Sequence, residues 1–251
     1  MINNSMTSDV KSVLTNLQEL NDTTTVSIKV PSTGKNVLFK LASVSQQKEL
    51  LRSAFDGVDG VIKRANILNK IITDNSTSDT DFLIIDKNVI LIELRKASVG
   101  SNITIKDVKY DLNDLQTFKK SDIQLKGTVI DDGITVKLKV PNLILDTEIN
   151  TKLGTELAKV TNQEEKIKQS IDIVVSYETS KYIDSIKVGD TAIVFDQISS
   201  YERREIVNNL PLKLSNKILD YIGGVKEVTD LSITFNDEVI VEIDASFLSA
   251  D

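Results

Sequence analysis

The sequence predicts an α+β fold, with N-terminal helices and a β-hairpin, a small β-hairpin module in the middle, and a helical C-terminal part that ends in a β-hairpin. Two patterns support this class. Apolar residues recur three and four positions apart near both ends, which is typical of helices, and they alternate with polar residues over 102–140, which is typical of strands. We therefore expect an N-terminal α+β domain (1–100), a β-hairpin module (101–145) and a helical domain with a C-terminal β-hairpin (146–251).

The chain starts with a predicted amphipathic helix of about three turns. Residues 7–9 (Thr-Ser-Asp) can cap this helix. Its apolar positions are Val10, Val13, Leu14 and Leu17. Apolar and polar residues then alternate over 26–30 and 37–41, on either side of Pro-Ser-Thr-Gly at 31–34. This second pattern predicts a β-hairpin.

Two further helices are predicted before residue 74. Ser43 or Ser45 can cap the first, and Gly57 or Gly60 can end it. The second spans 61–73, where apolar residues return at helical spacing.

The most apolar stretch is DFLIIDKNVILIELRKASVG at 81–100, which suggests a membrane segment, a catalytic strand or a core helix that presents something to a partner. Its charged residues interrupt the run too often for a membrane span, and the chain has no His or Cys to make it catalytic. We predict a helix over 87–98, with Asp86 or Asp81 as N-cap. Because apolar residues cover almost its whole circumference, either the domain wraps both sides or another protein covers one.

Three residues are candidate partner contacts. Arg95 sits at the end of the predicted central helix, so it forms either an internal salt bridge, to Asp86 or to an acid in the N-terminal domain, or a contact that orients a partner loop. Ile92 would support a partner-covered helix if it were exposed in the isolated chain. Phe247, near the C-terminus, is either part of the core or an anchor for a neighbour's pocket.

The middle and C-terminal parts contain further signals. Asp132-Gly133 between two alternating runs predicts a tight hairpin turn. After Pro141 the pattern becomes helical to about Tyr182. The following predictions are a short connection at 186–190, a capping box at Ser199–Glu202, a helix from Pro211 that stops at Gly223-Gly224, and two strands around Asn236-Asp237.

Composition excludes several kinds of site. Without cysteine there is no disulfide, zinc-thiolate site or thiol nucleophile, and without histidine there is no Ser-His-Asp triad. A net charge of −7 argues against a nucleic-acid partner. The N-terminus has no signal-peptide pattern and no apolar run is long enough to span a membrane. We expect a cytosolic protein with no membrane partner.

Acidic motifs give no metal site. The segment 56–60 (Asp-Gly-Val-Asp-Gly) resembles part of a calcium loop, but the next helix follows at once, so we expect a turn. Asp131-Asp132 lies at a predicted hairpin tip, where aspartate favours the turn itself. Phosphate- and dinucleotide-binding glycine motifs are absent. We predict no catalytic, metal or cofactor-binding residues and no cofactor, with a carboxylate-based hydrolase as the enzymatic alternative.

One family resemblance covers most of the chain. The segment 81–100 resembles the baseplate hub or hub-assembly proteins of contractile-tailed bacteriophages related to the T-even group. Further similar segments are Leu50-Leu51, Phe55-Asp56-Gly57, Leu68-Asn69, the hairpin at 26–41, Leu210-Pro211-Leu212 and Ile243–Phe247. Some relatives carry paired zinc-type cysteines in the middle module, and this chain has none there.

The resemblance implies a non-enzymatic protein that binds other phage tail proteins as the baseplate hub assembles, in a complex that can hold several symmetric copies. It is either retained in the virion tail baseplate or acts as a transient chaperone in the host cytoplasm. A cellular adaptor unrelated to phage remains an alternative.

Overall fold

The computed structural model describes residues 7–115, 124–159, 173–235 and 239–249. It confirms the α+β class, since helices combine with small antiparallel sheets. The predicted turn at Asn236-Asp237 and the helical pattern over 160–172 lie outside the described residues. In the part of the chain that is described, no helix is both long and apolar enough to cross a membrane.

The N-terminal region follows the predicted order closely. Its elements are α1 (Ser8–Thr23), β1 (Thr25–Lys29), β2 (Asn36–Lys40), α2 (Val44–Arg52), α3 (Gly57–Asn75) and α4 (Lys87–Ser98). The hairpin β1–β2 and the bounds of α4 are as the sequence predicts. Ser43 caps α2 in a capping box with Gln46.

Gly57 or Gly60 was expected to end a helix, but α3 begins at Gly57 and includes Gly60. A short 3-10 turn, Ser53–Phe55, separates α2 from α3 and ends the first helix instead. A Cβ atom at Gly60 would lie 2.2 Å from the carbonyl oxygen of Ser53, so this glycine allows the two helices to approach.

The two hairpins of the predicted middle module enter different sheets. The strands β3 (Asn102–Ile105) and β4 (Val108–Asp111) pair only with each other, whereas β5 (Lys126–Asp131) and β6 (Ile134–Lys139) begin a four-stranded sheet. Asp132 and Gly133 have φ angles of 43° and 76°, as the predicted tight turn requires. The domain boundaries at 101 and 145 stay a prediction.

The predicted connection at 186–190 was wrong, because it is part of a β-hairpin. The strands β7 (Ile183–Val188) and β8 (Thr191–Val194) complete the sheet in the order β5-β6-β7-β8. Burial of Ile183 and Ile186 against the helices stabilises β7, and Gly189 adopts the positive φ of 58° that the turn needs.

The C-terminal region is mainly helical. Its elements are α5 (Leu143–Leu157), a helical stretch at 173–180, α7 (Ser200–Asn208), α8 (Leu212–Leu231), β9 (Thr234–Phe235) and β10 (Val239–Ile240). Short 3-10 helices are Ile84–Asp86, Leu112–Asp114 and Phe195–Gln197. The capping box of Ser199 and Glu202 starts α7 as predicted.

The helix α8 does not stop at Gly223-Gly224, which corrects a prediction. It runs to Leu231, with Ile222 and Val225 buried on either side of the glycine pair. A glycine inside a helix costs about 1 kcal/mol relative to alanine, which is less than burying a large apolar side chain contributes.

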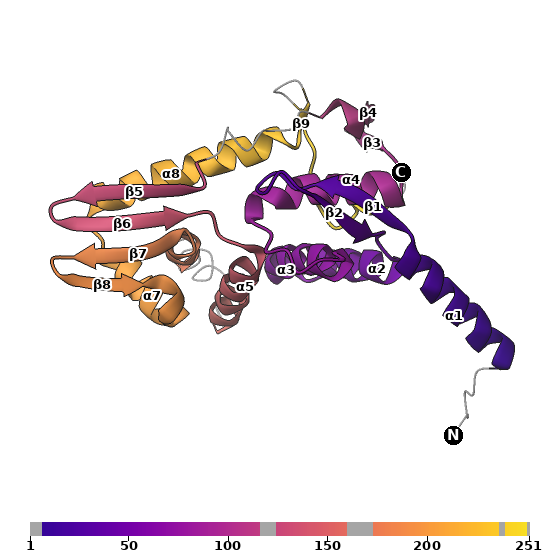
Figure 1. Ribbon diagram of the computed structural model, residues 1–251, viewed down its shortest axis with the longest axis horizontal. Coiled ribbons are helices and arrows are strands. Elements are labelled where there is room, and N and C mark those ends of the chain that lie inside the picture. Colours follow the sequence, from indigo (N-terminus) through magenta and orange to yellow (C-terminus); the bar gives the residue numbers. More distant parts are fainter. Residues whose placement is uncertain (1–6, 116–123, 160–172, 236–238, 250–251) are drawn as a thin grey trace.

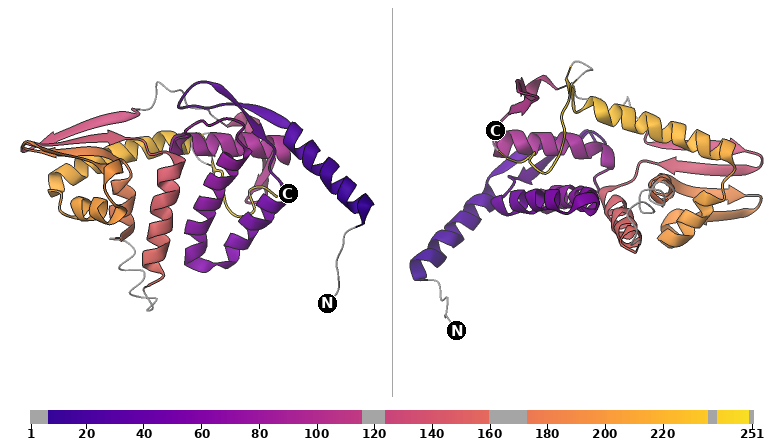
Figure 2. Two further views of the ribbon diagram at one scale, coloured as in Figure 1. Left: turned by 60° about the horizontal axis from the view of Figure 1, so that its bottom comes forward. Right: turned by 180° about the vertical axis from the view of Figure 1, so that it is seen from behind.

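The molecule is elongated, as Figure 1 shows, with the four-stranded sheet at one end and α1 projecting from the other. One core joins α3, α4, the β1–β2 hairpin and the C-terminal segment. A second core lies between the sheet and α8, and a smaller one between α5 and the helical stretch at 173–180. Among the described elements, α7 and α8 lie on one face of the sheet and none lies on the other (Figure 2).

Candidate interaction surfaces

Asp86 anchors the start of α4 to the β1–β2 turn. It occupies the N-cap position, but its carboxylate does not cap α4 as predicted. It instead accepts hydrogen bonds from the backbone N–H and the hydroxyl of Ser32, both at 2.7 Å, and from the N–H of Leu83 at 2.9 Å. Burial raises the pKa of the Asp86 carboxyl, and these hydrogen bonds partly offset that rise.

Arg95 lies at the opposite end of α4, where its side chain is 2% exposed. Nine residues of helix separate it from Asp86 by about 13 Å, so the predicted ion pair between these two does not form. Its guanidinium donates hydrogen bonds to the carbonyl oxygens of Gly100 (3.3 Å) and Asn102 (3.1 Å). These bonds hold the chain where α4 leads into β3.

The structure brings Arg95 and Phe247 together. The guanidinium carbon of Arg95 lies 5.8 Å from the centroid of the Phe247 ring, a cation–π distance. Phe247 and Ile92 are 3% and 4% exposed, and both belong to the core around α4. The exposure of Ile92 that would have supported a partner-covered helix is therefore not found. Contact of any of the three with a partner stays a prediction.

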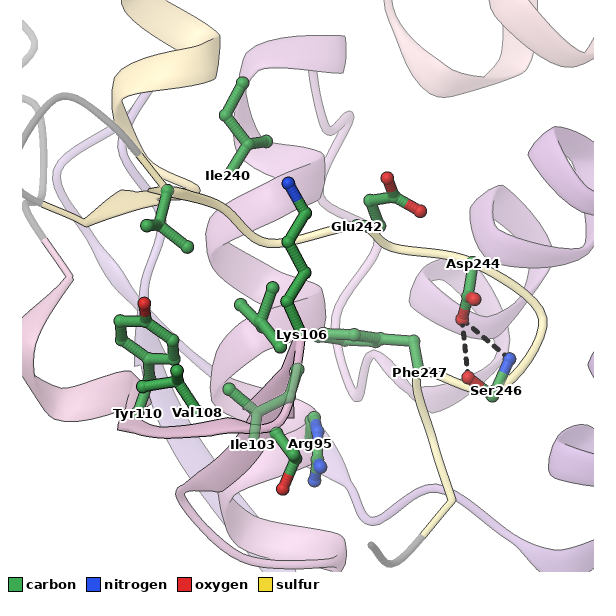
Figure 3. A pocket seen from close by; sticks show the side chains of 13 residues that line it. Arg95, Ile103, Lys106, Val108, Tyr110, Ile240, Glu242, Asp244, Ser246 and Phe247 are labelled. Atoms are coloured by element: carbon green, nitrogen blue, oxygen red, sulfur yellow. Dashed lines mark hydrogen bonds between the residues drawn. The ribbon is translucent and has the colours of Figure 1, made fainter.

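A groove of about 650 Å³ opens beside Arg95 and Phe247 (Figure 3). The β3–β4 hairpin forms one side, and β10 with the segment that follows it forms the other. Exposed Lys106 lies on the hairpin side, whereas Glu242 and Asp244 lie on the C-terminal side. Asp244 accepts two 2.8 Å hydrogen bonds from Ser246, which shape the C-terminal segment.

Acidic side chains outside the groove also serve structural contacts. Asp131 at the end of β5 binds Lys213 (2.9 Å) and Lys217 (3.2 Å), and these hydrogen bonds hold its pKa below the usual range. It thereby ties the sheet to α8. The described residues contain no group of three or more acids, histidines or cysteines that could hold a metal ion.

A buried ion pair that the sequence analysis missed lies where α3 meets α5. Asp146 binds Lys181 at 2.6 Å and accepts a hydrogen bond from Asn69. Burial alone would raise the pKa of Asp146, but Lys181 and Lys87 outweigh this effect and lower it. Burial lowers the pKa of Lys87 to about 8. Asp146 falls on the buried face of α5 between Leu143 and Ile149, a spacing that could have revealed it.

The helix α1 carries an exposed apolar stripe, which we define as Val10, Val13, Leu14, Leu17 and Leu20. Each of these side chains is between 41% and 60% exposed. The last turn of α1 is held to the body by an ion pair between Asp22 and Lys40 (2.7 Å). Figure 1 shows the rest of the helix projecting from the molecule.

The uncovered face of the four-stranded sheet is rich in lysine. Side chains of directly paired residues share a face, and Lys126 pairs with Lys139, Thr135 with Lys187, and Lys137 with Ser185. The four lysines therefore lie on one side, opposite the buried Val136 and Leu138. Lys139 is bound to Asp184 and Asp196, whereas Lys126, Lys137 and Lys187 are exposed. We call Lys126, Lys137, Lys139 and Lys187 the lysine face.

Comparison with known proteins places this geometry in a family. No curated protein and no solved structure matches the chain. A family model described as "T4 bacteriophage base plate protein" matches residues 22–237, which is most of the chain. The match includes α4, the β3–β4 side of the groove and the lysine face, whereas the C-terminal side of the groove follows it. The chain therefore belongs to the family of T4 bacteriophage base plate proteins.

Proposed function

We propose that this chain is a non-enzymatic structural or assembly protein of the baseplate hub, which binds other tail proteins while the baseplate of a contractile phage tail forms. The family match over residues 22–237 is the observation that carries this proposal. A baseplate protein works by holding neighbours, so its functional sites are surfaces. It meets its partners in the host cytoplasm and resides in the virion tail if it is retained.

The contacts of the charged residues support a non-enzymatic role. Asp86 and Asp131 accept hydrogen bonds that join secondary-structure elements, and Asp146 is paired inside the fold. Carboxylates engaged in this way are held by structural partners and do not converge on a common cleft. The groove has exposed Lys106 on one side and Glu242 and Asp244 on the other. Charges of both signs on opposite walls suit the binding of a polypeptide segment.

The lysine face supports a particular kind of partner. The chain as a whole carries a net charge of −7, yet this uncovered sheet face presents lysines. Complementary charge steers association and selects partners more than it adds affinity. We infer that an acidic surface of another tail protein covers this face.

Copurification with the other tail proteins of the same phage tests the proposal. The wild-type chain should form a defined complex with at least one of them, and K137E/K187E should weaken that complex by about tenfold or more, because like charges would then meet. Lys152→Glu changes an exposed lysine on α5 and is the matched control. Binding that survives K137E/K187E would reject the lysine face, and failure to bind any tail protein would reject the assembly role.

A protein inventory of mature virions then separates the two versions of the role. Presence of the chain in complete tails at fixed stoichiometry indicates a retained hub component. Its absence from complete tails, together with a defect in tail assembly when the gene is deleted, indicates a chaperone that leaves. A catalytic role would instead be indicated if replacing a single Asp or Glu stopped tail assembly while the variant still bound its tail proteins normally.

A further inference from the structure

The apolar stripe of α1 has the spacing of a coiled coil. Val10, Val13, Leu17 and Leu20 are separated by three, four and three residues, so they occupy successive a and d positions of a heptad repeat. Leu14 takes the e position beside them. A repeat of this kind keeps its apolar residues facing a partner helix along its whole length.

The charges around the stripe identify the partner. The e and g positions are Asp9, Leu14, Asn16, Asn21 and Thr23, so the flanks of the stripe carry a single charge, Asp9 in the first turn. Flanking charges normally set partner choice and orientation. In a parallel pair Asp9 would lie opposite the uncharged Leu14 of the other copy, so two copies of this helix would meet without like-charge repulsion at their flanks. A membrane surface is disfavoured, because the helix has three acidic residues and only Lys11 as a cation.

We propose that α1 is a self-association element, in which the helices of two or more copies of the chain pack along their apolar stripes as a short coiled coil. The family match begins at residue 22, so almost all of α1 precedes it, and the proposal does not depend on the hub assignment. A helix of 16 residues is about 24 Å long, and coiled coils this short are marginal alone. The association should therefore be reversible and strengthen with concentration.

Sedimentation of the full chain over a range of concentrations tests the proposal. The wild type should shift from monomer to a defined oligomer as concentration rises. Leu17→Asp places a charge in the stripe and should weaken association by about tenfold or more. Gln18→Asp makes a similar change at an exposed b position and should leave association unchanged. A wild type that stays monomeric throughout, or an L17D variant that associates normally, overturns the proposal.

Crosslinking provides a second test that does not rely on loss of structure. The chain has no cysteine, so Val13→Cys introduces its sole thiol. In a parallel pair, V13C should form a disulfide-linked dimer much faster than Ser12→Cys, which points away from the stripe. In an antiparallel pair, V13C should instead crosslink to Leu17→Cys in a mixture. The proposal is overturned if neither V13C by itself nor the mixture of V13C and L17C crosslinks faster than S12C.

Discussion

The helices α4 and α1 each contain a cluster of large apolar residues, but their surroundings differ completely. In α4, Ile90, Leu91 and Leu94 are fully buried between the β1–β2 hairpin, α3 and the C-terminal segment. In α1, Leu17 and Leu20 stay more than half exposed. The family match includes all of α4 and starts only at the end of α1.

The distribution of apolar residues around each helix explains this difference. In α4 they occupy consecutive positions from Val89 to Ile92, so most sides of the helix need a neighbour, and the domain buries Ile90, Leu91 and Ile92. In α1 they follow one narrow stripe, which a single neighbouring helix can cover. An all-round apolar helix thus indicates a core within one chain, whereas a heptad stripe without a neighbour indicates contact between chains.

The largest expected effect is loss of a buried side chain of α4. Leu91→Ala should lower the free energy of unfolding by about 3 kcal/mol, because it removes buried apolar contacts and leaves a cavity in the core. Denaturant unfolding followed by circular dichroism measures the change. A loss below about 1 kcal/mol would show that α4 is not the centre of this core.

Removing the anchor of α4 should have a somewhat smaller effect. Asp86→Ala leaves the backbone N–H groups of Ser32 and Leu83 without their acceptor, which should lower the free energy of unfolding by about 2 kcal/mol. The loss is less than three charged hydrogen bonds would suggest, because burial of the carboxylate already opposes folding. Ser32→Ala removes only the hydroxyl bond and should lose about 1 kcal/mol. If Asp86→Ala and Ser32→Ala lowered the free energy of unfolding equally, the backbone hydrogen bonds of Asp86 would not contribute as expected.

Periodicity alone predicted much of the fold. The period of α4 gave both of its bounds, and that of the first hairpin gave its pairing. At Gly223-Gly224 a local stop signal was outweighed by tertiary packing. At Gly57 the error had another cause, because the first helix had already ended in the 3-10 turn Ser53–Phe55. The strand β7 was missed because its stability comes from pairing with β6, a long-range contact that periodicity does not reveal.

The candidate contacts could be predicted only in part. The sequence singled out Arg95 and Phe247, and the structure places them against each other across 152 residues of chain, a proximity that no local pattern encodes. The carboxylate of Asp86 was expected to cap its own helix, but two of its three hydrogen bonds come from Ser32, in a turn far away in sequence. The lysine face depends on strand pairing and could be recognised only in three dimensions.

Lys87, the first residue of α4, should make stability depend on pH. Burial lowers its pKa from 10.5 in the unfolded chain to about 8 in the folded one. Between these values the unfolded state binds more protons, so stability rises with pH. Relative to Lys87→Met, the wild type should gain about 2 kcal/mol between pH 8 and pH 10, measured by denaturant unfolding. Lys152 is exposed, so the difference in stability between the wild type and Lys152→Met should not change with pH. If the difference between the wild type and Lys87→Met also stayed constant with pH, the lowered pKa of Lys87 would be contradicted.

The smallest effect is expected for a leucine-to-alanine change in α1, the counterpart of Leu91→Ala in α4. At concentrations where the chain is monomeric, Leu17→Ala should change the free energy of unfolding by less than about 0.5 kcal/mol, because the side chain has no core to leave. At high concentration the same variant should lose the extra stability that association gives the wild type, since binding to the folded state stabilises it by mass action. Thermal unfolding at two concentrations measures both effects. A loss above about 1 kcal/mol in the dilute sample would mean that α1 packs on its own chain, and the contrast with α4 would fail.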